Sequence, residues 1–162
     1  MKRISSAAGR AAVWGSHLGL FALLLGTGPG LAADAEAYLP WEAVDFAIPK
    51  PLGGLSGDPE RGRDLVVARD KGNCLACHQL PIPEEADHGN LGPPLVGVAA
   101  RLTPGQIRLR LVDETYLNPV TIMPGYYRDP ARLHRVAPAL AGRTVLSAQE
   151  IEDVLAYLVT LK

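Results

Sequence analysis

Two cysteines and a histidine lie together in the pentapeptide Cys74–His78, and these are the residues best suited to chemistry. Two thiols three residues apart on one turn can each add to a vinyl group of a haem, and the adjacent imidazole can then bind the iron. Such covalent links would fix the cofactor to a short helix. The pattern Cys-x-x-Cys-His therefore predicts one covalently attached haem c, held by Cys74 and Cys77, with His78 as an axial ligand.

Three other uses of the cysteines compete with haem attachment. A thioredoxin-like redox pair requires a preceding strand and a βαβ context, which the sequence does not show. A zinc site would recruit His88 or His134, at a spacing that matches no familiar zinc pattern. A disulfide between Cys74 and Cys77 is sterically awkward within a helix and gives His78 no role.

A haem iron bound by His78 has a second axial position, for which Met123 is the candidate. It is the methionine left once the initiator is set aside, and it lies in a proline- and glycine-containing loop, residues 121–125. A thioether ligand favours ferrous iron, raises the potential relative to a second imidazole and leaves no open site for peroxide. We predict that Met123 is this ligand, and the alternative is a core methionine that fills a gap. His88 and His134 lie among polar residues, as solvated loop histidines do.

Other side chains and one backbone group are candidates for supporting roles around such a haem. A backbone carbonyl of the segment 92–95 can accept the other ring proton of His78 and so orient the imidazole, unless this segment is an ordinary proline-rich turn. Guanidinium groups bind carboxylates well, so the arginines 101, 108 and 110 are candidates for haem propionates or an acidic partner, or else for a solvated helix face. Tyr126 and Tyr127 are candidates for the haem edge beside Met123, with ordinary burial as the alternative.

The N-terminal residues are typical of a secretory signal. Basic residues precede a short apolar run, residues 18–25, and small residues follow up to position 33. The run is far short of the ~20 residues that a membrane-spanning helix needs. We predict that residues 1–33 are a signal peptide, whose exact cleavage site stays open, and that the mature chain is periplasmic. Residues 34–57 hold several prolines and glycines and are predicted to be an extended arm.

Capping signals place helices in the remaining domain, residues 58–162. Asp58 is followed by proline and glutamate, which predicts a helix start there, with Gly72 as its stop. The segments 103–106 and 147–150 are capping-box signatures that start two further helices. No long alternating run indicates a sheet. We therefore predict an all-α fold in which helices and long loops wrap around one covalently bound haem.

Charge is balanced overall and uneven along the chain. The formal net charge of −1, from 16 basic and 17 acidic residues, gives no indication of a nucleic-acid partner. We also expect no stable membrane insertion of the mature chain. Residues 34–100 are mainly acidic, whereas residues 101–143 contain seven arginines. This asymmetry fits either two solvated faces or a docking surface that steers an acidic partner.

Taken together, these features resemble class I cytochromes c. The likeness covers residues 58–162 and depends on the first helix, CLACH, the Gly-Pro-x-Leu loop, the methionine loop and a final helix that ends in AYLVTL. In that fold the first and last helices cross, with a small residue against an aromatic one, and Gly62 and Tyr157 match those positions. Pro93 matches the residue whose carbonyl supports the proximal histidine.

A closer resemblance is to the SoxX family of small monohaem cytochromes. It implies a heterodimer with the haem-containing SoxA subunit. This heterodimer would be an L-cysteine S-thiosulfotransferase, which oxidatively couples thiosulfate to a carrier-protein cysteine. It further implies that this chain is the non-catalytic, electron-accepting subunit, with the sulfur carrier protein and a downstream electron acceptor as transient partners. One position departs from the family pattern: residue 125 is glycine, where we expect a small residue with a side chain, such as alanine. The blocks that carry the resemblance are GNCLACHQLP, GNLGPPLVGVAARL, QIRLRLVDETYLNP and TIMPGYYR.

Another class of function stays open beside this one. A free-standing periplasmic cytochrome c that shuttles electrons between unrelated complexes would need the same haem ligands. A haem enzyme such as a peroxidase would need a vacant axial site, and Met123 argues against it.

Overall fold

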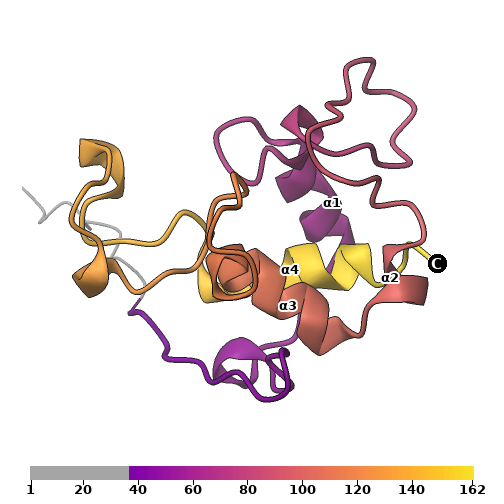
Figure 1. Ribbon diagram of the computed structural model, residues 1–162. Coiled ribbons are helices and arrows are strands. Elements are labelled where there is room, and N and C mark those ends of the chain that lie inside the picture. Colours follow the sequence, from indigo (N-terminus) through magenta and orange to yellow (C-terminus); the bar gives the residue numbers. More distant parts are fainter. Residues whose placement is uncertain (1–36) are drawn as a thin grey trace, which may run out of the picture. The chain divides into compact units, whose positions relative to one another are not determined.

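The computed structural model describes residues 37–162 (Figure 1). The predicted signal peptide and the first residues of the arm lie outside the described residues. The described chain contains four α-helices and several single 3-10 turns, and it has no strand, only an isolated bridge between Val44 and Ala47. The all-α prediction is therefore confirmed. None of the described helices is long and apolar enough to cross a membrane. The α-helices are α1 (Pro59–Val67), α2 (Val98–Arg101), α3 (Pro104–Asp113) and α4 (Ala148–Leu158).

Helix α1 begins where the capping signal predicts and ends earlier than expected. The Asp58 carboxylate accepts hydrogen bonds from the backbone amides of Glu60 and Arg61. The helix ends at Val67 rather than at Gly72. The reason is that the Leu65 carbonyl accepts from the Gly72 amide, 3.2 Å away, so the chain turns back before another helical turn can form. The prediction of this helix end was wrong by one turn.

Both capping boxes are present in the structure. The Thr103 hydroxyl accepts from the Gln106 amide at the start of α3, while the Gln106 side chain accepts from the Thr103 amide. Ser147 and Glu150 make the same pair of bonds at the start of α4. Each box satisfies backbone donors that a helix start otherwise leaves without partners. The predicted starts of these two helices are confirmed.

Helices α1 and α4 pack against each other at very close range, and we call this contact the helical crossing (Figure 1). A Cβ atom on Gly62 would lie 1.9 Å from the carbonyl oxygen of Asp153 and 3.0 Å from the Cβ of Tyr157. Only a residue without a side chain allows the two backbones to approach so closely. The expected contact between Gly62 and Tyr157 is therefore present. Val66 of α1 and Val154 of α4 are fully buried beside it.

The arm is fixed to α3 and α4 by a buried ion pair. Arg108 and Glu152 are only 5% and 4% exposed, and their side chains form two hydrogen bonds of 2.8 and 2.9 Å. The remaining guanidinium nitrogen of Arg108 donates to the Ile48 carbonyl, and Glu152 accepts from the Leu52 amide. Ile48 and Leu52 are buried in the core. The three roles considered for Arg108, namely haem propionate, partner contact or solvated face, were all wrong, because its charge is used inside the fold.

Candidate haem site

The pentapeptide Cys74–His78 forms a tight turn that holds its functional side chains in place. Asn73 starts it in the left-handed region at φ 47°, and Cys74–Ala76 is a 3-10 turn. The carbonyl of Cys74 then accepts from the amides of Cys77 and His78. The turn is tied to the following loop, because the Gly89 amide donates to Leu75 and the Gly92 amide donates to Cys77. These bonds place both sulfurs and the imidazole on one short piece of backbone.

The state of the two thiols bears on the competing uses of the cysteines. Neither Cys74 nor Cys77 forms a disulfide. Burial raises the pKa of the Cys74 thiol to about 12. Since the thiolate is the nucleophile in disulfide exchange, a Cys74 thiol that is protonated at neutral pH does not suit a redox pair. Among the described residues, no group of three or more His, Cys, Asp or Glu residues could hold a metal ion.

The histidines that a zinc site would recruit differ in their surroundings. His134 is exposed, as expected for a solvated loop residue. His88 is half-buried, and its Nδ1 accepts from the Leu80 amide at 3.3 Å while its Nε2 is buried without a partner. The expectation of a solvated His88 was wrong, because the hydrogen bond from Gly89 to Leu75 draws this loop against the Cys-x-x-Cys-His turn.

The ring of His78 is oriented by a backbone carbonyl, as the sequence indicated. Its Nδ1 lies 2.7 Å from the Pro93 oxygen. A carbonyl oxygen only accepts hydrogen bonds, so Nδ1 carries the proton and Nε2 keeps its lone pair for a metal. Gly92 packs directly against the ring, and a Cβ there would lie 2.3 Å from the His78 Cε1 atom. The backbone of the loop thus fixes both the tautomer and the position of the imidazole.

The loop that carries Met123 is anchored to α3 on both sides. Before the methionine, the Asn118 amide donates to the Glu114 carbonyl at 2.9 Å, just past the end of α3. After it, the amides of Tyr126 and Tyr127 donate to carbonyls of α3 at 3.1 Å. The Met123 amide itself donates to the Thr121 hydroxyl at 3.1 Å. Met123 is thus presented by a short segment held at each end.

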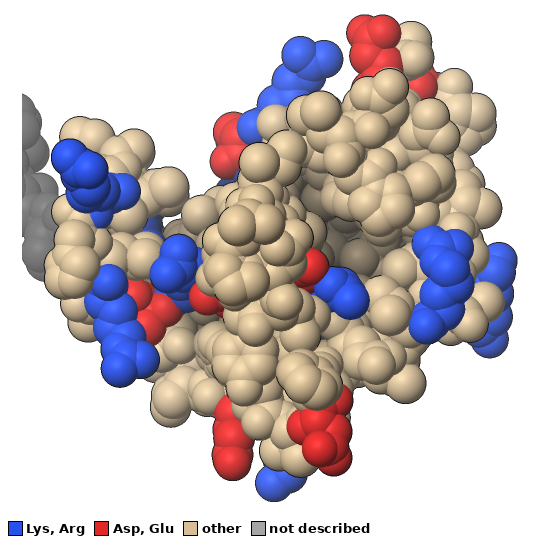
Figure 2. All heavy atoms as spheres, viewed as in Figure 1, with Lys and Arg blue, Asp and Glu red and all other residues tan. Residues whose placement is uncertain are grey.

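A cavity of about 540 Å³ brings the four predicted site residues together, and we call it the haem cavity. Cys74, Cys77, His78 and Met123 all line it, and a hollow lies near the centre of the face shown in Figure 2. Its volume lies in the range of pockets that enclose small molecules and cofactors. Most of the remaining lining is apolar, from Leu91, Leu95, Val98, Leu102, Ile107, Leu111, Ile122 and Leu158.

The donor set of this cavity fits a haem. Two thiols on one turn, an imidazole with a free Nε2 and a thioether are the groups that attach and ligate a c-type haem. The apolar lining suits a porphyrin and excludes water from the iron. Within the described residues, the cavity is the place where these four side chains meet.

Polar residues at the wall of the cavity include two of the expected arginines and one residue that was missed. Arg101 lines the cavity and donates to the carbonyls of Pro94 and Val96. Arg110 also lines it and binds both carboxylate oxygens of Glu114, at 2.7 and 2.9 Å. Sequence reasoning overlooked Glu114, although its i,i+4 spacing from Arg110 is the usual signal for such a pair.

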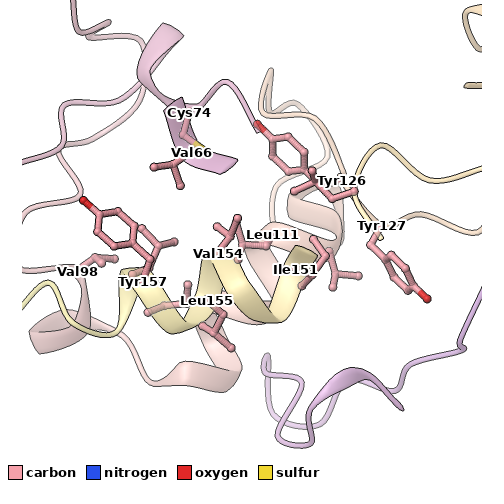
Figure 3. Packing of buried hydrophobic residues seen from close by; sticks show 14 of the residues in the cluster. Val66, Cys74, Val98, Leu111, Tyr126, Tyr127, Ile151, Val154, Leu155 and Tyr157 are labelled. Atoms are coloured by element: carbon pink, nitrogen blue, oxygen red, sulfur yellow. The ribbon is translucent and has the colours of Figure 1, made fainter. Parts of the chain in front are cut away.

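The two tyrosines considered for the haem edge point to different sides (Figure 3). Tyr126 lines the haem cavity, and its hydroxyl donates to the Gly72 carbonyl at 2.8 Å. Burial raises the pKa of the Tyr126 hydroxyl, so it stays protonated and can donate this bond. Tyr127 instead stacks on Tyr38 and accepts from the Leu39 amide, so it fixes the arm.

These features define a class of protein. Helices that cross at a glycine, together with an apolar cavity reached by a Cys-x-x-Cys-His turn and a methionine loop, are the cytochrome c fold. No family model matches the chain, and the comparison with curated proteins found no match either.

A solved structure identifies the family within this class. The chain is similar to a chain in the crystal structure of SoxXA from P. pantotrophus, with 34% sequence identity and a TM-score of 0.68. The match covers 75% of this chain and 94% of that one. The chain therefore belongs to the family of Sox-related cytochromes.

Proposed function

We propose that the chain is an exported, periplasmic monohaem cytochrome, the SoxX-type subunit that accepts electrons in a SoxAX complex. In this complex thiosulfate is oxidatively coupled to the cysteine of a carrier protein. The observation that carries the proposal is the meeting of Cys74, Cys77, His78 and Met123 at one apolar cavity. The likeness to a SoxXA chain and the signal-like residues 1–33 support it.

Each of the four residues has a defined task in this proposal. Cys74 and Cys77 would attach the cofactor to the turn through thioether bonds. His78 would hold the iron through Nε2, since its protonated Nδ1 is bound by the Pro93 carbonyl at 2.7 Å. Met123 would hold the iron from the loop anchored to α3. The bound haem supplies reversible one-electron oxidation and reduction.

The chain's own groups suit electron transfer and do not suit bond formation with thiosulfate. Joining thiosulfate to a cysteine requires a reactive sulfur or another strong nucleophile close to the oxidant. Cys74 and Cys77 are the only cysteines of the sequence, so no thiol remains once both are thioethers. We therefore assign bond formation to the partner subunit. Two electrons leave for each sulfur–sulfur bond, so they pass to this chain in two successive steps or are shared with the partner's haem.

The test is to produce the full chain together with a SoxA-type subunit in a host that matures c-type cytochromes. We expect one haem that stays attached after denaturation, a stable complex of the two chains and haem reduction on adding thiosulfate with the carrier protein. The double variant Cys74→Ser with Cys77→Ser is the control, and it should bind no haem covalently.

Other outcomes would contradict specific parts of the proposal. A red monomer that never binds the second subunit would favour the free-standing electron shuttle. A colourless wild-type product with two titratable thiols would show that the Cys-x-x-Cys-His turn holds no haem.

A further inference from the structure

The segment Arg128–Val145 has no role in the haem site, and we call it the basic lobe. It joins the Met123 loop to α4, contains two single 3-10 turns and stands out from the helices in Figure 1, where it is drawn in orange to gold. None of its residues lines the haem cavity. Most of its side chains are exposed. An excursion of this length with so little packing is characteristic of loops that bind.

The charge of the basic lobe is strongly one-sided. It contains four arginines and one histidine, against Asp129 as its acidic residue. The Asp129 carboxylate accepts from the Ala131 amide, and Arg128 pairs with Asp113 of α3 at 3.2 Å. Within residues 37–162, no ion pair engages the other three arginines, at positions 132, 135 and 143. Figure 2 shows basic side chains gathered at the left of that face.

A second cavity in the lobe combines two of these unpaired arginines, together with Arg128, with apolar walls. It has a volume of about 250 Å³, and Arg128, Arg135 and Arg143 all line it. Guanidinium groups bind carboxylates in a fork geometry, and apolar walls favour a ligand with a hydrocarbon stem. A small inorganic anion would leave those walls unfilled. The apolar residues of the lining are Pro124, Leu133, Val136, Leu140 and Val145.

We propose that the basic lobe docks an acidic segment of the partner subunit, with one Glu or Asp side chain entering the second cavity. The inference rests on the proposed function, since it takes the SoxA-type chain as the partner. Charge complementarity is its basis, because Arg132, Arg135 and Arg143 form no ion pair within residues 37–162 and so attract an acidic surface and speed its approach. Arg143 makes one neutral contact, from its Nε to the Ala139 carbonyl. The cavity then distinguishes a polypeptide carboxylate from a free ion.

The lobe is also in contact with the loop that carries the predicted axial ligand. Pro124, the residue after Met123, lines both the second cavity and the haem cavity. The next residue, Gly125, packs under Arg128, and a Cβ there would lie 2.6 Å from the Arg128 Cδ atom. A side chain seated in the second cavity would therefore touch Pro124, next to Met123, and docking should alter the visible spectrum of the holoprotein.

The experiment titrates the full-length holoprotein with the SoxA-type subunit and records association rates at low and at physiological ionic strength. The double variant Arg135→Gln with Arg143→Gln should associate about tenfold more slowly at low salt, with a weaker dependence on salt. The corresponding double lysine variant keeps the charge and should recover most of the rate. The matched control is Arg69→Gln, an exposed arginine that makes no ion pair in the described chain, and it should behave like the wild type.

Each remaining outcome overturns a definite statement. Wild-type rates in the double glutamine variant would overturn the docking site and leave the proposed function intact. An equal loss with Arg69→Gln would show an effect of net charge and also overturn the site. A wild-type chain that binds no SoxA-type subunit would overturn the proposed function and the docking site together. Sulfate that binds the second cavity without slowing the association of the partner, at an ionic strength matched with chloride, would make the cavity a site for small anions and reject the polypeptide.

Discussion

The helical crossing and the haem cavity are built in opposite ways. At the crossing, two backbones meet without intervening side chains, and the charged groups beside it, Arg108, Glu152 and Asp153, are buried and paired. Around the haem cavity, loops bond to the helices through their backbones, and about 540 Å³ lies between apolar side chains. The crossing completes its packing with protein atoms, whereas the cavity walls enclose a volume that the proposed haem would fill. Variants should therefore separate into those that change the free energy of unfolding and those that change the potential and ligand binding of the haem iron.

The largest loss of stability is expected at Gly62, in the helical crossing. The variant Gly62→Ala should lower the free energy of unfolding by about 4 kcal/mol, because its Cβ would overlap the Asp153 carbonyl. Denaturant unfolding of the holoprotein measures this loss. The control is Gly54→Ala, which has a positive φ of 71° with open space around it and should cost about 1 kcal/mol. Equal losses at the two glycines would contradict the close contact at the crossing.

The next effect should come from the buried ion pair. Arg108→Met leaves the Glu152 carboxylate buried without its partner and should cost about 3 kcal/mol. Replacing Glu152 by Leu in the same chain removes the second charge, and this double variant should be more stable than the single one. The visible spectrum of the haem should be unchanged in both, since neither residue lines the haem cavity. A double variant no more stable than Arg108→Met would show that the pair matters only through its bonds to the arm.

A smaller effect on stability, which depends on pH, is expected from Asp153. Burial acts to raise the pKa of this carboxyl, but hydrogen bonds from Arg61, the Asp58 amide and Gln149 together outweigh it and hold the pKa below its usual range. The stabilisation is therefore present above about pH 4, the ordinary value for Asp, and is lost as the pH falls through the lowered folded-state pKa. Asp153→Asn should cost about 2 kcal/mol at neutral pH and should flatten the acid limb of the stability profile.

The pH measurement has a matched control at a second aspartate. Asp70→Asn changes an exposed carboxylate that makes no ion pair among the described residues, and it should keep the acid limb of the wild type. An acid limb that persists in Asp153→Asn would assign the pH dependence to another group.

The variant Met123→Ala should have the smallest effect on stability and the largest effect on the haem potential. Met123→Ala should change the free energy of unfolding by about 1 kcal/mol or less, since the loop is held by backbone bonds on both sides. Its haem potential should fall, and the iron should bind added imidazole. Redox titration and ligand titration measure these changes. Ile122→Ala, the exposed neighbour at the same cavity, is the control, and an unchanged potential in Met123→Ala would remove the methionine from the coordination sphere.

The sequence predicts the parts of this molecule whose signals are local. Capping residues lie within three positions of the helix starts that they satisfy, so Asp58, Thr103 and Ser147 were found directly. The Cys-x-x-Cys-His turn is equally local. Met123 could be placed because few other residue types can serve as the ligand, and the structure brings it to the same cavity.

The parts that the sequence does not predict depend on distant partners. Arg108 looks like a solvent-facing helix residue until Glu152, 44 positions later, is brought beside it. The burial of His88 depends on a hydrogen bond between two loop segments. The second cavity draws its walls from residues 124–145, which have no periodic pattern. No local rule connects these residues, since tertiary packing alone brings them together.

The bond between the Leu52 amide and Glu152 spans 100 residues and has a consequence for the order of folding. During synthesis the apolar residues Ile48 and Leu52 leave the ribosome long before the helix that will cover them exists. They must stay exposed until nearly the whole polypeptide has been made. The arm emerges before the domain and is thus among the last segments to be secured, so its apolar residues need protection from aggregation on the way.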